Sequence, residues 1–85
     1  MAKFEVLILP SVRKDIRNIP KDDLRRITKR IDLLQDDPRP MGCVKLSGSE
    51  YYRIRQGDYR IIYEIRDAAL IVLVIKVGNR RDVYS

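Results

Sequence analysis

Apolar and alternating runs predict four strands. The first run, "KFEVLIL" at 3–9, stops at Pro10, as a strand that leads into a turn would. Three further runs follow later in the chain: 51–56, 59–66 and 70–77. Short turns at Gly57-Asp58 and near Asp67-Ala68 join these three runs and force antiparallel order. The last run contains "LIVLVIKV", which is apolar on both faces, so we expect a central strand with the first strand beside it.

Between the first strand and this meander, apolar residues recur at helical spacing. Three of them mark a first helix between Ser11, its expected cap, and Pro20: Val12, Ile16 and Ile19. Four mark a longer helix that should end near Asp37: Leu24, Ile27, Ile31 and Leu34. Each helix has one apolar stripe, so we expect a two-helix hairpin laid across the sheet. Residues 37–50, with two Pro and two Gly, are expected to be irregular.

The pattern predicts one α+β domain over 1–85, in which the first strand completes a four-stranded sheet. Eighty-five residues suffice for a single modest core. The 18 Lys and Arg against 12 Asp and Glu leave a net charge of +6, which favours a polyanion, an acidic protein or an anionic membrane surface as partner. The longest apolar run, "AALIVLVI", is too short to span a membrane, and Glu5 interrupts the N-terminal stretch. We therefore expect a cytoplasmic protein without a membrane partner.

The chain lacks the residues that common zinc sites and Cys-His catalytic sites need. It has no histidine, and Cys43 is its one cysteine. The common zinc and Cys-His catalytic patterns are thereby excluded, as is an internal disulfide framework. Cys43 is interpreted as a small apolar residue, because nothing adjacent to it would lower its pKa. We expect no metal and no cofactor.

The segment "YYRIRQGDYRIIY" raises a question about charge. If Gly57-Asp58 is a two-residue hairpin loop, positions that sum to 115 face each other, so Ile54 meets Ile61 on one face and Arg55 meets Arg60 on the other. Arg53 shares the face of the two arginines. Like charges opposed across a ladder destabilise a sheet. The arrangement therefore indicates an anionic ligand.

The sequence adds cations and rings to this arginine face. Arg80 and Arg81 follow the last strand, and Tyr51 and Tyr84 flank the group in the sequence. Guanidinium forks match phosphate oxygens, and bases stack on aromatic rings, so the set predicts a single-stranded RNA site. The alternative is that exposed arginines only keep the sheet soluble. Three other tyrosines share the face of the isoleucines and are predicted to lie in the core: Tyr52, Tyr59 and Tyr63.

Three segments together resemble the RelE toxins of the RelE/ParE superfamily: "KLSG" at 45–48, "YYRIRQGDYRIIYEI" at 51–65 and "IVLVIKVGNRRDVY" at 71–84. The resemblance covers nearly the whole chain and implies a RelE-like fold of the microbial ribonuclease type. It also implies a toxin that enters the ribosomal A site, contacts ribosomal RNA and cleaves mRNA there. A cognate acidic RelB-like antitoxin would hold this endoribonuclease inactive.

The resemblance also implies roles by position. Arg53 and Arg55 fall near the attacking ribose. Arg60 and Arg80 fall where the phosphate and leaving group are held, and Tyr84 supports the site. Better-known members have lysines where this chain has Arg53 and Arg55, and arginine is a poor general base because it stays protonated. Lys45 or Tyr84 is then the candidate for proton transfer. Three residues complete the expected RNA contacts: Lys45, Tyr51 and Arg81.

Two other functions remain open from the sequence. A ParE-like toxin would inhibit DNA gyrase by protein contact and cut nothing, and a non-catalytic module would only bind RNA. The gyrase-directed branch would not need the candidate catalytic set: Arg53, Arg55, Arg60, Arg80 and Tyr84. These residues therefore favour the ribonuclease.

Overall fold

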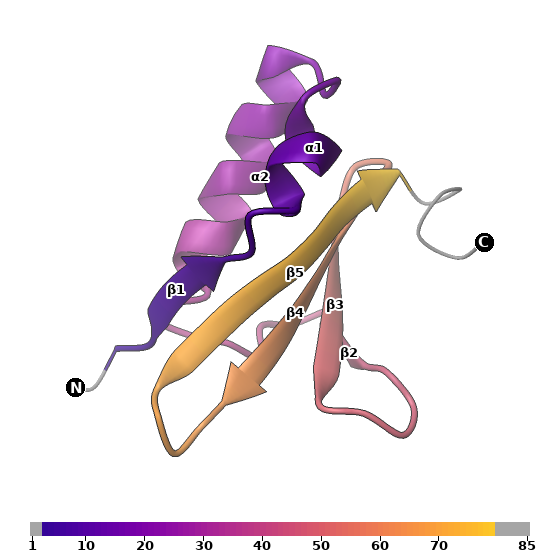
Figure 1. The fold of residues 1–85 in the computed structure, drawn as a ribbon. Coiled ribbons are helices and arrows are strands. Elements are labelled where there is room, and N and C mark those ends of the chain that lie inside the picture. The colour runs from indigo at the N-terminus through magenta and orange to yellow at the C-terminus, as the bar shows by residue number, and fades with distance from the viewer. Residues whose placement is uncertain (1–2, 80–85) are drawn as a thin grey trace.

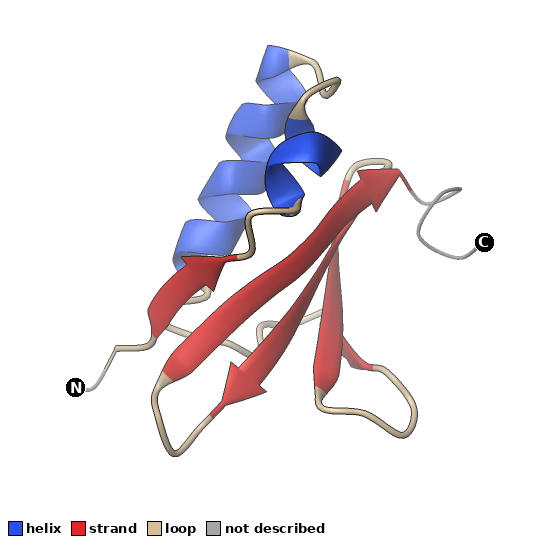
Figure 2. Ribbon diagram, in the orientation of Figure 1, coloured by secondary structure: helices blue, strands red, loops and turns tan. Residues whose placement is uncertain are grey.

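The computed structural model describes residues 3–79, which form a twisted five-stranded sheet with two helices on one side (Figures 1 and 2). The helices are α1 (Val12–Ile16) and α2 (Lys21–Leu33). The strands are β1 (Glu5–Ile8), β2 (Val44–Lys45), β3 (Tyr51–Gln56), β4 (Tyr59–Arg66) and β5 (Ile71–Asn79). The α+β class predicted from the sequence is confirmed.

The strand order is β1-β5-β4-β3-β2. β1 runs parallel to β5, from Glu5 opposite Ile71 to Ile8 opposite Val74, and the other neighbours are antiparallel. Two parallel strands need a crossover connection, and α1 and α2 supply part of it. The meander and the position of the first strand beside β5 are therefore as predicted.

Two details of the prediction are wrong. The sheet has five strands, because Val44 and Lys45 pair with β3 inside the stretch that was expected to be irregular. A strand of two residues is too short to leave an alternating pattern. The second helix ends at Leu33 and not near Asp37, because the chain leaves it through tight turns such as the bond from Leu34 N–H to the carbonyl of Ile31.

The helix-facing side of the sheet is the hydrophobic core. Side chains from α1, α2, the turn after α2 and the strands pack together there: Val12, Ile27, Ile31, Leu34, Ile54, Ile61, Tyr63, Ile65, Val72, Val74 and Val77. Tyr52 and Tyr59 are half-buried against this cluster, so the prediction that the three tyrosines belong to the core is confirmed. Neither helix in residues 3–79 is long and apolar enough to cross a membrane.

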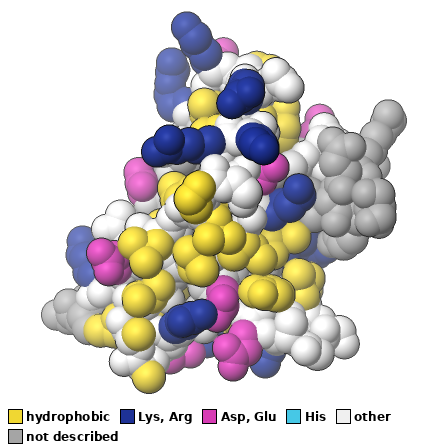
Figure 3. All heavy atoms as spheres, in the orientation of Figure 1, with side chains coloured by type: hydrophobic (Ala, Val, Ile, Leu, Met, Phe, Trp, Pro, Cys, Tyr) yellow, Lys and Arg dark blue, Asp and Glu magenta, His cyan; other side chains and the backbone are white. Residues whose placement is uncertain are grey.

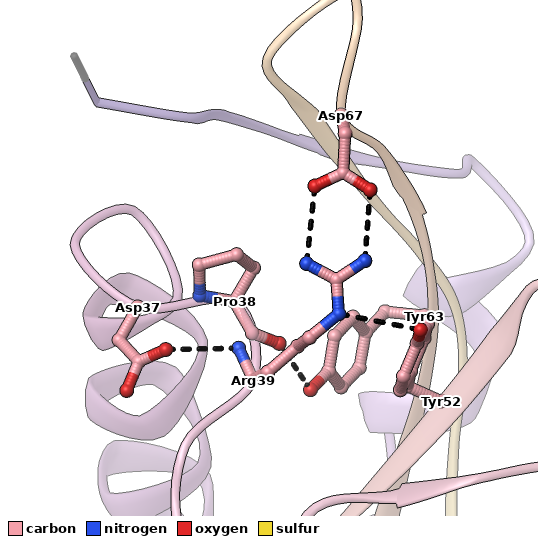
Figure 4. Close-up of polar contacts among 6 residues, drawn as sticks. All are labelled: Asp37, Pro38, Arg39, Tyr52, Tyr63 and Asp67. Atoms are coloured by element: carbon pink, nitrogen blue, oxygen red, sulfur yellow. Dashed lines mark hydrogen bonds and ion pairs between the residues drawn. The ribbon is translucent and has the colours of Figure 1, made fainter.

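A polar clamp closes the end of the core beyond α2 (Figure 4). The Arg39 guanidinium donates two hydrogen bonds to the Asp67 carboxylate, at 3.0 and 2.8 Å, and lies 5.2 Å from the centre of the Tyr52 ring. The buried Tyr63 hydroxyl donates to the carbonyl of Pro38 at 2.7 Å. These contacts fasten the α2–β2 loop to β3, β4 and the β4–β5 turn.

The clamp predicts a pH dependence of stability. Hydrogen bonds from Arg39 hold the pKa of the Asp67 carboxyl below its ordinary value. When the pKa in the folded state is lower than in the unfolded state, the ionised group stabilises the fold fully at pH values above the unfolded pKa of about 4. This stabilisation disappears as the pH falls through the folded-state pKa. We therefore expect Asp67→Asn to lower the free energy of unfolding at about pH 7 and to lower it by less at about pH 2.

Urea unfolding at both pH values measures this difference. Asp22→Asn is the control, because its carboxylate is exposed and lies 3.8 Å from Arg25 in a surface pair, which contributes little. An Asp67→Asn difference of the same size at both pH values would contradict the assignment.

Candidate functional site

Three arginines near the β3–β4 hairpin loop lie on the outer face of the sheet, which is the face turned away from the helices. Ile54 and Ile61 are buried on the helix side, and successive strand residues alternate between faces. The register pairs Arg55 with Arg60 and Arg53 with Ile62, as the two-residue hairpin loop predicted. Gly57 adopts φ +60° in that loop, which glycine tolerates without strain. We call Arg53, Arg55 and Arg60 the arginine cluster.

The three arginines differ in how deeply they lie. Arg60 is 8% exposed, Arg53 is half-buried and Arg55 is exposed. Guanidinium groups stay protonated, so Arg55 and Arg60 cannot relieve their mutual repulsion by losing a proton. An anion that sits among them would relieve it. The arginine cluster is therefore equipped to bind phosphate with planar, multiply donating groups.

Two predicted RNA-binding residues lie on different faces. Tyr51 alternates with Arg53 and Arg55 on the outer face of β3 and is exposed, so it is available to a base near the arginine cluster. Lys45 pairs with Tyr52 and therefore shares the helix-side face. The register thus places Lys45 on the opposite face from the arginine cluster, because its neighbour Val44 is the residue opposite Arg53. Its contact with RNA stays a prediction.

Arg80, Arg81 and Tyr84, which the sequence assigned to the site, lie outside the described residues. The end of β5 lies beside the arginine cluster. Gly78 pairs with Arg60 and Asn79 pairs with Tyr59.

Lys76 is a further cation, which the sequence did not indicate: its register position is on the outer face, but its ammonium lies 3.6 Å from the Asp15 carboxylate of α1. It pairs with Ile62, the residue that also pairs with Arg53. Simple alternation along β5 would have put Lys76 on the core face with Val72 and Val74. A register shift adds one residue to β5 between the partners of Ile62 and Tyr63, and such a bulge changes the face of the residues after it. In the sequence, the only sign of this change of face was that Lys76 is a charged residue inside an otherwise apolar run.

A groove of the described chain lies away from the arginine cluster. This groove of about 630 Å³ runs between β1, α1 and α2 and is lined mainly by apolar side chains, among them Val6, Ile8 and Leu24. In Figure 3 hydrophobic side chains gather over β1 and β5, with Lys and Arg side chains around them. The groove holds no member of the arginine cluster, so its chemistry is not that of a phosphate site.

Neither a metal-ligand cluster nor a tyrosine with a shifted pKa adds a catalytic group to the outer face within the described residues. Residues 3–79 hold no cluster of three or more metal-ligating side chains. Burial raises the pKa of the Tyr63 phenol, whose hydroxyl is engaged with Pro38 in the core.

Comparisons with known proteins place the chain in a family. Residues 6–84 match the family model described as the ParE toxin of the type II toxin-antitoxin system parDE. The chain is 31% identical to a Methanocaldococcus jannaschii protein that carries the name toxin RelE1, over 98% of this chain and 97% of that one. RelE in the RelE–RelB complex of Pyrococcus horikoshii OT3 superposes with a TM-score of 0.82 at 30% identity, covering 93% of this chain and 97% of that one. The isolated E. coli RelE toxin gives a TM-score of 0.76 at 27% identity, covering 98% and 92%. The chain therefore belongs to the ParE toxin family of type II toxin-antitoxin systems, within the RelE/ParE superfamily.

Proposed function

We propose that this toxin is a ribosome-dependent endoribonuclease that cleaves mRNA in the ribosomal A site and so inhibits translation. The observation that carries the proposal is the arginine cluster, with Arg55 opposed to Arg60 across the β3–β4 ladder. An arrangement of like charges that costs stability is typical of a functional site. Similarity to RelE toxins at 27 and 30% identity supports the same branch of the superfamily.

The proposed reaction is attack of a ribose 2′-hydroxyl on the adjacent phosphate. The 2′ oxygen bonds to phosphorus, the bond to the 5′ oxygen breaks, and the products are a 2′,3′-cyclic phosphate and a 5′-hydroxyl. One proton leaves the attacking hydroxyl and one is gained by the leaving oxygen. Arg53 and Arg55 would lie near the ribose. Arg60 with Arg80 would stabilise the charge on the phosphate, a preorganised electrostatic role, and Tyr84 would support the site and is a candidate for proton transfer.

The ribosome enters the proposal because the chain has little catalytic equipment of its own. With no histidine and a cluster of permanently charged arginines, the toxin stabilises charge but does not by itself bend a flexible mRNA into attack geometry. Programmed ribosomes hold the message in a defined position. Tyr51 and Arg81 would add contacts to mRNA or ribosomal RNA.

The proposed protein partner is an acidic RelB-like antitoxin. A related toxin from Pyrococcus horikoshii OT3 was crystallised as a RelE–RelB complex. The present chain has a net charge of +6 and concentrates arginines on one face, so an acidic and partly disordered segment is complementary to it. We propose that such a segment covers or distorts the arginine cluster, and that both proteins act in the cytoplasm.

A second candidate function is inhibition of DNA gyrase without RNA cleavage. The observation in its favour is the family model, whose description names ParE. Gyrase inhibition would act through protein contact and would give the arginine cluster no chemical task. Passive RNA binding is a third candidate, in which the same cluster would bind phosphate without turnover.

The test incubates purified toxin with programmed ribosomes, naked mRNA and DNA gyrase in parallel. We expect cleavage at A-site codons on ribosomes, cleavage of the same naked mRNA slower by about two orders of magnitude or more, and unimpaired supercoiling. Intact message together with inhibited gyrase would establish the second candidate. RNA retained in a filter-binding assay without cleavage on ribosomes would establish the third.

A further inference from the structure

Among residues 3–79, no strand pairs with the C-terminal half of β5 on the side of β1. β1 pairs with β5 only from Ile71 to Val74, whereas β5 continues to Asn79. Backbone N–H groups along that open edge need another acceptor, because an unpaired buried N–H is costly. Helix α1 lies beside this part of β5, near the end of the strand (Figure 1).

Asp15 of α1 supplies the acceptor. Its carboxylate accepts a hydrogen bond from the Val77 N–H at 3.1 Å, and its other oxygen lies 3.6 Å from the Lys76 ammonium. The Asp15 side chain is only 17% exposed, and Val77 is fully buried in the core. The bond therefore joins α1 to β5 in a place that is largely shielded from water, where a charged acceptor is strong.

This bond fixes a segment that borders the arginine cluster. Val77 precedes Gly78, which pairs with Arg60. The extra residue of the β5 bulge comes just before Lys76, and Val77 comes just after it. The bond from Val77 to Asp15 therefore follows the bulge directly and holds the register that the bulge creates. A shift there would move the backbone opposite Arg60.

We infer that Asp15 is a positioning residue for RNA cleavage, acting through the backbone of Val77 and Gly78 on the position of Arg60. The inference rests on the proposed function. Asp15 touches no substrate in this role, because its carboxylate is already bound to β5. A carboxylate close to the RNA phosphate would also be repelled by the like charge. Its contribution is geometric, and displacements of about 1 Å in a site are enough to lower a rate by about a hundredfold.

The test compares Asp15→Ala with Asp15→Asn, which loses the charge but keeps an oxygen that can accept from Val77. Asp22→Ala is the matched control, an acidic residue whose carboxylate is exposed on α2. Cleavage of mRNA on programmed ribosomes is measured over toxin concentrations up to saturation. The maximal rate and the concentration at half-saturation are then obtained separately. We expect a fall of about 10- to 100-fold for Asp15→Ala with unchanged half-saturation. Asp15→Asn should stay within about threefold of the parent, and Asp22→Ala should match the parent.

Amide hydrogen exchange at Val77 and the chemical shifts of Gly78 and the Arg60 side chain are measured on the same variants by NMR. Asp15→Ala should exchange faster at Val77 and shift both neighbours, with Asp15→Asn close to the parent. Parental cleavage by a folded Asp15→Ala variant with faster Val77 exchange would overturn the inference. If the parent itself does not cleave mRNA, the proposed function fails, and unchanged signals at Gly78 and Arg60 in Asp15→Ala would separately overturn the positioning role. Asp15→Ser replaces Asp15→Ala if the latter does not fold.

Discussion

Replacing Arg60 by alanine should lower mRNA cleavage on ribosomes by about 10²- to 10³-fold, the cost of removing a preorganised group that stabilises transition-state charge. Arg60 is the deepest member of the arginine cluster, at 8% exposure, so its position is well fixed. Arg60→Lys keeps the charge but loses the planar fork, and we expect it to recover only part of the activity. In cells, the alanine variant should be non-toxic at expression levels at which the parent arrests growth.

The fold should tolerate this change. Alanine loses the packing and the other contacts of the Arg60 side chain, but it also removes the repulsion between Arg55 and Arg60, so we expect the variant to remain folded and soluble. Urea unfolding checks this. Arg66→Ala is the control, because Arg66 lies on the same face of β4 at its far end and pairs with Glu64 at 2.9 Å. Full cleavage by a soluble Arg60→Ala variant would remove Arg60 from the site.

The fold could be predicted from the sequence where its pattern was long or its turn was defined. The register of β3 and β4 followed from Gly57-Asp58 alone, and the structure reproduces it at Arg55 opposite Arg60. The fifth strand could not be predicted, because β2 is held by pairing with β3 and not by a pattern in Val44 and Lys45. Local propensity does not report such tertiary pairing.

The arginine cluster could be predicted for the same reason as the register, since three arginines alternate with core residues on two strands joined by a tight loop. Lys45 and Lys76 show the limit of this reasoning. Lys45 belongs to the strand that no pattern marked, and the face of Lys76 depends on a bulge in β5. Asp15 shows no pattern in the sequence either, because its bond to Val77 spans 62 positions. Side chains that serve the site through distant backbone groups therefore require the structure.

Removal of the proposed 2′-hydroxyl nucleophile is the second change for which we expect a large loss of cleavage. A single 2′-deoxy substitution at the nucleotide before the scissile phosphate should abolish cleavage at that linkage, because the proposed nucleophile is then missing. The toxin has no histidine and, within residues 3–79, no cluster of metal-ligating side chains that could activate a water instead. Cleavage of the all-ribose message should leave a 2′,3′-cyclic phosphate and a 5′-hydroxyl, which mass spectrometry of the fragments detects.

The matched message carries the deoxy substitution one codon away, where cleavage at the A site should proceed at the parental rate. This control separates loss of the nucleophile from a change in how the ribosome holds the message. Slow cleavage of naked RNA should also continue when a chelator is added, since the 2′-hydroxyl needs no metal to attack. Cleavage that persists at the substituted linkage would mean that water attacks the phosphate, because a linkage without the 2′-hydroxyl has no internal nucleophile. The arginine cluster would then still stabilise negative charge at the phosphate, but a base for water would have to come from the ribosome or from residues beyond Asn79.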